Sequence, residues 1–234
     1  MRFAIGSLLV LLPLLAIAMT PEQLQEIDAA QHDFVTNNGY TPAADVNVED
    51  QLAAANGNAT FALVQQIEGA GNRATIEQGG IGNVAMVLQG FGDSNEAHVQ
   101  QIGVDNLALV TQVGQGNFVS QLNQLGNANY ANVSQKGDAN VATISQLNDA
   151  NRLALTQRDG FNQADIEQNG GTDLTVSQTN AAGSSSFVND LLLRAWAEPG
   201  ASPTFSPVTL DGPGSTQLYL CNGSVAYCDG VLPH

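Results

Sequence analysis

The sequence predicts an all-β fold, a β-solenoid built from two-strand rungs, and three observations lead to this prediction. The skeleton Asn-x-Ala-x-Ile/Val-x-Gln, clearest in Asn72–Gln78, recurs from about residue 58 to residue 180. The glutamines that close the skeletons are 10 to 12 residues apart, which leaves room for short strands and tight turns but not for helices. All 8 prolines lie outside residues 58–180, as a continuous ladder of backbone hydrogen bonds requires.

The alternation within each skeleton predicts rows of stacked amides. Asn, Ala, Ile or Val, and Gln lie two residues apart, so an extended strand points all four side chains to one face. Strands stacked about 4.8 Å apart let each amide bond to the equivalent amides above and below, whereas a buried group without a partner costs about 1–3 kcal/mol. The two end rungs are expected to present unpaired backbone groups and amides, so that identical molecules bind end to end. The expected ladder residues are Asn72, Gln78, Asn83, Gln89, Asn95, Gln101, Asn106, Gln112, Asn129, Gln135, Asn140, Gln146, Asn151, Gln157, Asn162 and Gln168.

Alternate strands carry different side chains on the face opposite the amides. In the strands that end at Gln66, Gln89 and Gln112 this face is apolar, and in those that end at Gln78 and Gln101 it is polar. The repeating unit is therefore two strands, with odd strands stacked in one sheet, even strands in a second, and the amide-bearing faces turned inward. The outer apolar stripe is either covered by the leader at residues 19–56 or by the helix predicted at residues 187–196, folded back onto it, or used for contact between fibres or with the cell surface. It consists of Phe61, Leu63, Val84, Met86, Leu88, Leu107, Leu109 and Tyr130.

The repeat is imperfect at a few positions, and glycines cluster in the predicted turns between strands. Thr60 and Thr172 replace the first Asn in the outermost strands, and Leu153 replaces the Ala in another. The strand from Asn117 has one extra residue before Gln124, which predicts a β-bulge there.

The chain before the repeat divides into two segments. Residues 1–18 are predicted to be a secretory signal peptide, because Arg2 precedes an apolar run and Ala-Ile-Ala at residues 16–18 fits the small-x-small cleavage site. Residues 19–56 are weakly patterned and form either a mobile leader or an address for a dedicated export pore. Residues 57–180 form the predicted solenoid.

Residues 181–234 are predicted to be a C-terminal extension outside the repeat. The apolar spacing over residues 187–196 predicts a short helix that ends before Pro199. The Asn-Gly pair at residues 222–223 lies between two alternating runs, which favours a β-hairpin.

Charge and residue types argue against several classes of function. With 6 Lys and Arg against 22 Asp and Glu, the net charge is −16, so nucleic acid is not an expected partner, since phosphate binding needs clustered basic residues. In an exported protein Cys221 and Cys228 are expected to form a disulfide, which would staple the hairpin. A metal site is not expected at these cysteines, because two thiols with no nearby His other than His234 fall short of a tetrahedral zinc shell. The histidines share no spacing with a nucleophile, and the inner face carries amides rather than paired acids, so no catalytic residue, cofactor or small-molecule substrate is expected.

Aspartates mark the predicted turns. They lack the nonapeptide pattern of calcium-binding β-rolls, so no metal site is expected. Stacked on neighbouring rungs, their carboxylates are expected to repel one another and slow assembly. These turn residues are Asp93, Asp105, Asp138, Asp149 and Asp159.

The segment Gln78–Gln89 resembles the curlin repeat, Gln-x-Gly-x-x-Asn-x-Ala-x-x-x-Gln. It carries the motif through Gln78, Gly80, Asn83, Ala85 and Gln89, and units of this kind run in register over roughly 120 residues. Curlin proteins are exported, secreted through an outer-membrane pore, and assemble as extracellular amyloid fibres in biofilm matrix. The resemblance therefore implies a secreted subunit of a fimbrium-like fibre that mediates adhesion. Its implied partners are further copies of the chain, other curlin subunits and the export pore.

Two departures from the curlin pattern leave the role of the chain open. Most strands open with Asn where the family's first strand usually opens with Ser, which is similar to the minor, nucleating subunit. The extension after residue 180 is not part of the repeat pattern. If residues 46–56 and 187–196 cap the terminal rungs, the chain is instead a non-polymerising solenoid adhesin at the cell surface.

Overall fold

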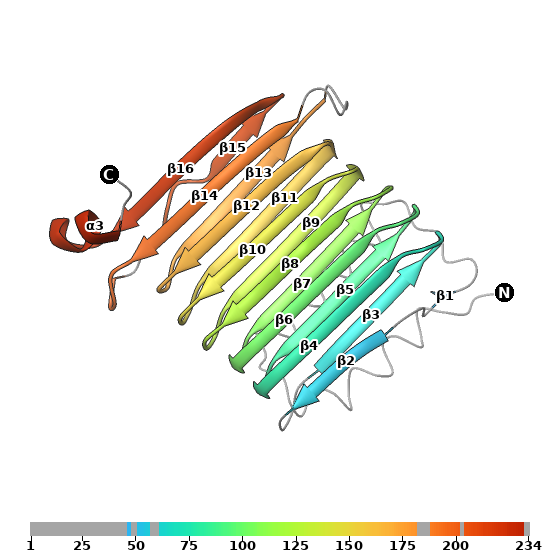
Figure 1. Cartoon of the computed structure of the whole chain (residues 1–234), viewed down its shortest axis with the longest axis horizontal. Coiled ribbons are helices and arrows are strands. Elements are labelled where there is room, and N and C mark those ends of the chain that lie inside the picture. Colours follow the sequence, from blue (N-terminus) through green and yellow to red (C-terminus); the bar gives the residue numbers. More distant parts are fainter. Residues whose placement is uncertain (1–45, 48–50, 57–60, 182–187, 202–203, 232–234) are drawn as a thin grey trace.

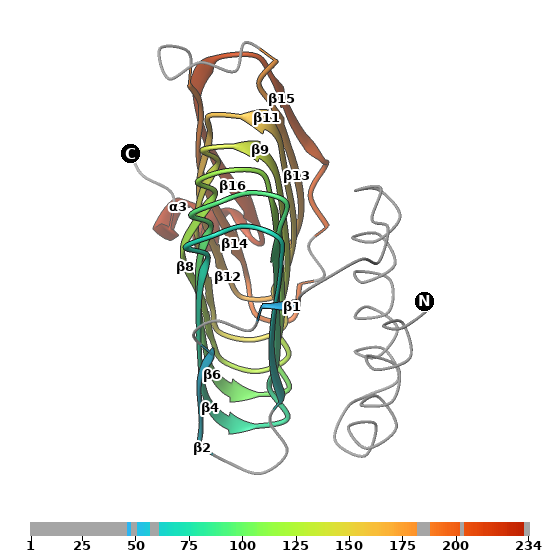
Figure 2. The same cartoon turned by 90° about the vertical axis from the view of Figure 1, so that its right-hand side faces the viewer.

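The computed structural model describes residues 46–47, 51–56, 61–181, 188–201 and 204–231. Its strands form two eight-stranded sheets, A and B, that lie face to face (Figures 1 and 2). Among the described residues, one helix, α3 (Val225–Val231), follows the last strand. Sheet A contains, in order, β1 (Val46–Asn47), β3 (Phe61–Ile67), β5 (Val84–Gly90), β7 (Leu107–Val113), β9 (Tyr130–Asp138), β11 (Arg152–Gly160), β13 (Asp173–Thr179) and β15 (Val208–Asp211). Sheet B contains β2 (Gln51–Asn56), β4 (Arg73–Ile81), β6 (Glu96–Val104), β8 (Phe118–Leu125), β10 (Val141–Leu147), β12 (Asn162–Asn169), β14 (Asn189–Ala197) and β16 (Gly214–Asn222).

Consecutive strands alternate between the two sheets, so the chain winds as a solenoid with one strand of each sheet in every rung. Neighbouring strands within a sheet are parallel, apart from β1, which runs antiparallel to β3. Parallel pairing follows from the winding, because the chain returns to a sheet in the same direction after each full rung. This confirms the predicted all-β solenoid and the predicted division into odd and even strands.

The rungs stack in register, so equivalent residues of the repeat lie above one another. In sheet A, Val87 pairs with Val64 and Val110, and Gln89 lies between the glutamines of the two neighbouring strands. The inward Ala, Val, Leu and Ile side chains of both sheets form one continuous buried core. Buried Asn and Gln side chains flank this core at the strand ends. The period-two pattern of the sequence therefore defines the inner face of both sheets.

The end of β4 shows why glycine is required where the chain turns between sheets. Gly80 has a φ of +111°, and a Cβ at this position would lie 1.9 Å from the carbonyl oxygen of Gly103 on the next rung. A Cβ on Gly103 would lie equally close to the carbonyl oxygen of Gly126. A side chain does not fit between turns stacked this tightly, and glycine also adopts the positive φ without steric cost.

The extra residue in the strand from Asn117 forms the predicted β-bulge. β8 shifts its register against β10 between Ala142 and Thr143, which leaves Ser120 without a partner residue across the strand pair. The Ser120 hydroxyl instead bonds to the carbonyl oxygen of Ala142 (3.2 Å) and to Thr143 Oγ1 (2.6 Å). The bulge absorbs one residue, so Gln124 remains in line with the glutamines of the neighbouring strands.

The helix predicted for residues 187–196 is wrong, because residues 189–196 belong to β14, a strand that pairs with β12 and β16. Residues 189, 191, 193, 195 and 197 are buried, and those between them are half-buried. Three consecutive leucines at 191–193 fit a helical and an alternating pattern equally well. Pairing with the edge of β12 decides the conformation, since tertiary contacts outweigh weak local preference.

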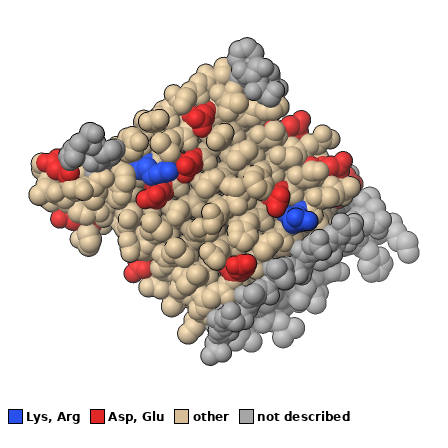
Figure 3. Space-filling view, in the orientation of Figure 1, with Lys and Arg blue, Asp and Glu red and all other residues tan. Residues whose placement is uncertain are grey.

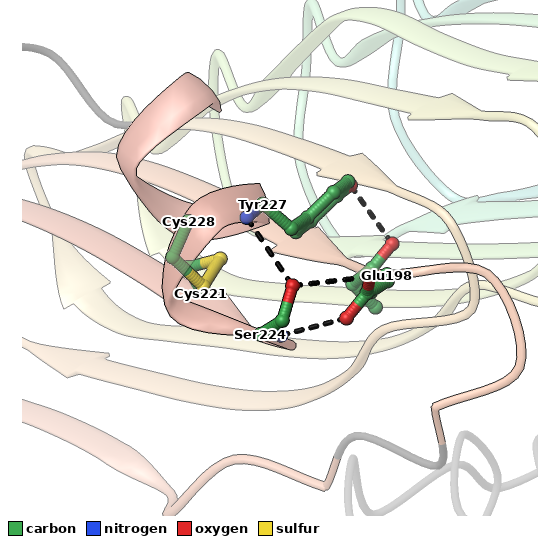
Figure 4. Close-up of a disulfide and its surroundings, with 6 residues drawn as sticks. Glu198, Cys221, Ser224, Tyr227 and Cys228 are labelled. Carbon is green, nitrogen blue, oxygen red and sulfur yellow. Dashed lines mark hydrogen bonds between the residues drawn. A yellow bond between two sulfur atoms is a disulfide. The ribbon is translucent and has the colours of Figure 1, made fainter.

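The predicted hairpin around residues 222–223 is also wrong. β16 pairs along its whole length with β14, and the chain after it forms α3 rather than a returning strand. Cys221 at the end of β16 and Cys228 in α3 form a disulfide (Figure 4). Glu198 accepts hydrogen bonds from the backbone N of Ser224 (2.6 Å) and from its hydroxyl (3.2 Å), which ties the start of α3 to the end of β14 (Figure 4). The Tyr227 hydroxyl adds a bond to the carbonyl oxygen of Ala197 (2.9 Å).

The solenoid extends beyond the predicted range of 57–180. β2 adds a strand to sheet B before it, and β14, β15 and β16 continue both sheets after it. The segment predicted as a leader, 19–56, thus contains β1 and β2, whereas the predicted signal peptide and residues 19–45 lie outside the described residues. Within the described residues, no helix has the length and apolarity to cross a membrane.

Candidate assembly site

Two columns of buried glutamines run through the solenoid, one along each sheet. Each interior glutamine donates from Nε2 to Oε1 of the glutamine on the following rung, at 2.7–2.9 Å. All of these bonds point toward the C-terminal end, so both columns have a direction. The sheet A column is Gln66, Gln89, Gln112, Gln135, Gln157 and Gln178, and the sheet B column is Gln78, Gln101, Gln124, Gln146 and Gln168.

The glutamines also join the two sheets to each other. Gln89 Nε2 donates to the carbonyl oxygen of Arg73 (2.9 Å), and Gln101 Nε2 donates to that of Val84 (3.0 Å). In each case the acceptor is the first residue of the preceding strand, which belongs to the opposite sheet. Because these side chains are fully buried, water cannot replace a lost bond, and each buried group left unsatisfied costs about 1–3 kcal/mol.

Asparagines at the strand starts form a second pair of columns, in which the hydrogen bonds run the other way. Asn106 donates from its backbone N (3.1 Å) and from Nδ2 (2.9 Å) to Asn83 Oδ1, so the later rung donates to the earlier one. Asn106 Nδ2 also donates to the carbonyl oxygen of Gly126 in the turn of the next rung (2.8 Å). Each asparagine therefore binds its own column and an adjacent turn. The columns are Asn72, Asn95, Asn117, Asn140 and Asn162 in sheet B, and Asn83, Asn106, Asn129 and Asn151, followed by Thr172, in sheet A.

The structure places all sixteen predicted ladder residues in these four columns, and all are buried. Gln66, Asn117, Gln124 and Gln178 belong to the columns as well, although they are missing from the predicted set. Asn117 and Gln124 are separated by the bulge, so their spacing is one residue longer than in the regular repeat. Gln66 and Gln178 close the outermost repeats, which start with Thr instead of Asn.

The strands at the C-terminal end have no amide in line with the glutamine columns. β14 places Ala195 at the position of Gln168, and β16 places Leu220 beyond it. In sheet A, β15 places Leu210 at the position of Gln178. The expectation that the end rungs present unpaired amides is therefore wrong at this end. Apolar residues therefore occupy the glutamine positions in the last two strands of sheet B, β14 and β16, and in the last strand of sheet A, β15.

In sheet B, each amide column stops at a buried acceptor that has no hydrogen-bond partner. At the N-terminal end this atom is Gln78 Oε1, and the register pairs Gln78 with Ala55 of β2. At the C-terminal end it is Asn162 Oδ1, although Asn189 occupies the paired position in β14. Asn189 Nδ2 donates instead to the carbonyl oxygen of Leu210 (3.1 Å). The glutamine column donates toward the C-terminal end, so the acceptor of its first residue, Gln78, has no donor. The asparagine column donates toward the N-terminal end, so the acceptor of its last residue, Asn162, has none.

The edge strands define the surfaces that a second molecule could meet. β15 and β16 are the last strands of the two sheets at one end, and β1 and β2 are the last strands at the other (Figure 1). β16 is nine residues long and pairs with β14 on one side, and no described residue pairs with its other side. Its inward Leu218 and Leu220 are only partly buried against the core. An open backbone edge with apolar side chains next to it is a template for a further strand.

The outer face of sheet B carries few charges, and its basic groups lie beside acidic ones (Figure 3). On this face Arg194 of β14 bonds to Asp165 of β12 through Nη2 and Oδ2 (3.0 Å), and Arg194 Nε lies 3.6 Å from a carboxylate oxygen of Glu167. These contacts join β14 to the last complete repeat strand. An exposed pair of this kind contributes about 0–1 kcal/mol.

The turn aspartates bind backbone amides of neighbouring rungs. Asp138 Oδ1 accepts from the backbone N of Gln115 (2.9 Å), and Asp149 Oδ1 accepts from that of Asn127 (2.8 Å). The residue that each of these carboxylates bonds to is therefore uncharged. On the other side of Asp138, Gly160 pairs with Asp138 and Asp159 pairs with Gly137, so two acidic residues do lie on adjacent rungs there. In the part of the chain that the structure describes, no group of three or more His, Cys, Asp or Glu side chains could hold a metal ion.

A comparison with protein families identifies the repeat. The model described as the curlin-associated repeat matches the chain three times, over residues 72–103, 92–120 and 126–158. These residues contain the central strands and the middle of all four amide columns, whereas β2 and β14 to β16 lie outside the matches. No curated protein and no solved structure is significantly similar to the chain.

Proposed function

Because the repeat region of this chain belongs to the curlin-repeat family, we propose that the chain is a curli-type subunit whose function is self-assembly into extracellular amyloid fibres. In this proposal residues 1–18 direct export and are then removed, and the rest of the chain leaves the cell through an outer-membrane pore. The fibres serve as biofilm matrix and attach cells to surfaces, with other curlin subunits as further partners. The observation that supports this most directly is the open, nine-residue edge of β16 at the end of a stack of parallel rungs.

Head-to-tail stacking is the mode of assembly that this end favours. A second molecule in the same orientation can place its β2 beside β16, since both strands belong to sheet B. Backbone hydrogen bonds at the usual strand spacing of about 4.8 Å would then continue the sheet across the junction. The same contact would cover Leu218 and Leu220, which the monomer leaves partly exposed, and burial of apolar surface stabilises by about 25 cal/mol per Å².

Purified residues 19–234, incubated and followed by thioflavin fluorescence and electron microscopy, test the proposal. We expect a lag, then fibres with a repeat of about 4.8 Å along their axis. Leu218→Lys puts a charge on the inward face of the terminal strand and should slow fibre growth strongly. Gln217→Lys makes the same change in charge at the adjacent exposed position and should leave the growth rate nearly unchanged. Equal growth rates for the two variants would show that β16 is not the growing end.

A second candidate function is a monomeric solenoid adhesin at the cell surface. The amide-free terminal strands favour it, because the ladders stop inside the molecule and cannot continue unbroken into a neighbour. A chain that stays monomeric for days under conditions where curli-type fibres form would support the adhesin and overturn the fibre proposal.

A further inference from the structure

The outer face of sheet A carries a second apolar cluster, separate from the inner core. It consists of Ile67 of β3, Val84, Met86 and Leu88 of β5, and Leu107 and Leu109 of β7. Phe61, Leu63, Phe91, Val113 and Tyr130 pack around it. We call this surface the outer apolar face. It occupies the half of sheet A nearest the N-terminal end, and its side chains point away from the amide ladders.

This face is covered. Met86 and Leu109 are each 1% exposed although they point outward. On β9 and β11 of the same sheet, the smaller outward residues Ser134 and Thr156 are only half-buried. Strands on either side therefore leave an outward side chain partly exposed, and the burial of β5 and β7 requires atoms above the sheet. The described elements are the strands of the two sheets and α3, which follows β16 at the opposite end of the stack (Figure 1).

We propose that residues 19–45 of the same chain dock on the outer apolar face and cover it in the exported protein. The start of this segment at residue 19 rests on the proposed export, in which residues 1–18 are removed. The rest of the inference does not depend on that proposal. The other segments outside the described ranges contain at most six residues, which is too short for a face that is three strands wide, or about 10 Å, and several residues long.

The chain path brings this segment to the face. β1 lies antiparallel to β3 with Val46 opposite Ile67, and Ile67 is itself part of the cluster. Val46, which directly follows the segment, thus lies at the edge of the outer apolar face. If the segment is helical, about twelve of its residues would span about 18 Å. Twelve residues are less than half of those between positions 19 and 45.

The sequence of the segment suits an apolar surface. Leu24, Ile27, Phe34 and Val35 fall within about 100° of one another on a helical projection. Polar residues, mostly Gln, Glu and Asp, occupy much of the remaining surface of such a helix. Docking in this way would close the one large apolar side of the solenoid and leave its two ends open, so that molecules associate at their ends rather than side by side.

Oxidation of Met86 by hydrogen peroxide, quantified by mass spectrometry, tests the proposal, because sulfoxide formation follows the exposure of the sulfur. The protein is residues 19–234 at a concentration and time at which it is monomeric by size exclusion. We expect Met86 to oxidise at least about tenfold more slowly than in the same chain in urea. A variant with Leu24→Ser, Ile27→Ser and Phe34→Ser should lose most of this protection. The matched control, Gln25→Ser, Glu26→Ser and His32→Ser, changes positions outside the apolar arc of the projection and should keep the protection. Circular dichroism verifies that both variants retain the solenoid.

Several results would overturn the proposal. Met86 in residues 19–234 that oxidises as fast as in urea means that the face is open. Protection that is present only in the full chain assigns the cover to residues 1–18. Protection that rises with protein concentration and survives the triple apolar substitution assigns it to a second copy. Fibre formation is measured separately by thioflavin fluorescence, so a chain that never polymerises still gives a result for Met86.

Discussion

Replacing Gln101 with Leu should destabilise the solenoid far more than the same change at the adjacent Gln100. Gln101 is fully buried, accepts a bond from Gln78 Nε2 (2.7 Å), and donates to Gln124 Oε1 (2.7 Å) and to the carbonyl oxygen of Val84 (3.0 Å). Leu has a similar size but removes all three bonds, and both acceptors lose the Gln101 donor inside the core. At about 1–3 kcal/mol for each buried group left unsatisfied, the expected cost is about 2–6 kcal/mol.

Gln100 provides the matched control because it lies on the same strand but points outward. It is half-buried, and its amide donates to a Glu77 carboxylate oxygen at 3.3 Å. Loss of a surface contact of this kind costs about 0.5 kcal/mol. The assay is urea unfolding of freshly prepared monomer, followed by far-ultraviolet circular dichroism, with the midpoints of the two variants compared. If Gln101→Leu unfolds no earlier than Gln100→Leu, the buried amide columns do not stabilise the fold and the reasoning from unsatisfied amides fails.

Three further predictions concern a turn glycine, a turn aspartate and the Cys221–Cys228 disulfide. Gly80→Ala forces alanine into a positive φ and places its Cβ 1.9 Å from a backbone oxygen, so the free energy of unfolding, measured by thermal denaturation, should fall by at least about 2 kcal/mol. Gly79→Ala is the control, because a Cβ there has no atom within 4 Å, and it should leave the stability unchanged. Asp138→Asn keeps the acceptor for Gln115 N but removes a charge, and should shorten the fibrillation lag without moving the unfolding midpoint. Asp138→Ala should lower stability by about 1 kcal/mol, and an unchanged lag in the Asn variant would discard charge repulsion as the cause of the lag. Cys221→Ser opens a short ring, worth about 2.5 kcal/mol by loop entropy, and should speed amide exchange in α3 alone, because α3 buries no residue; faster exchange throughout β12 would contradict this.

Most of the fold can be predicted from the period of two in the sequence, because the same alternation determines where each strand lies, which face points inward and which residues pair between rungs. The alternation around Val87 and Gln89 identifies the strand, its inner face and its partner positions on both neighbouring rungs. The irregular spacing from Asn117 to Gln124 predicts the bulge for the same reason, since any extra residue must be absorbed before the glutamine returns to its column.

The C-terminal strands could not be predicted in this way because their sequences no longer carry the amides. In β14 the leucines at 191–193 satisfy both a helical and an alternating period, and only the unpaired edge of β12 selects the strand. The Asn-Gly pair at 222–223 does end β16, but the chain after it forms α3, which the Cys221–Cys228 disulfide and the bond from Ser224 N to Glu198 hold next to the ends of β16 and β14. The outer apolar stripe is visible in the sequence, whereas its burial is not, because the alternation within β5 and β7 does not indicate what lies above the sheet.

The opposite directions of the amide columns give every rung a polarity, and this has a consequence for the proposed fibre. Gln101 donates toward the C-terminal end, while Asn106 donates back toward the N-terminal end. A rung turned end over end would oppose donor to donor in one column and acceptor to acceptor in the other, so all rungs of an unbroken amide ladder must run in the same direction.

The terminal strands lack these amides, so a junction between two molecules would depend on backbone pairing and on apolar contacts such as those of Leu218 and Leu220. Interior rungs have the same backbone pairing plus amide bonds in four columns, each worth about 0.5–1.5 kcal/mol net. The junction is therefore the weakest rung of the fibre. Urea should release folded monomers from fibres at a concentration below the unfolding midpoint of the monomer, as measured by sedimentation together with circular dichroism of the supernatant. A supernatant that contains only unfolded chains would mean that the junction is as strong as the interior, and that the amide columns continue across it after rearrangement of the ends.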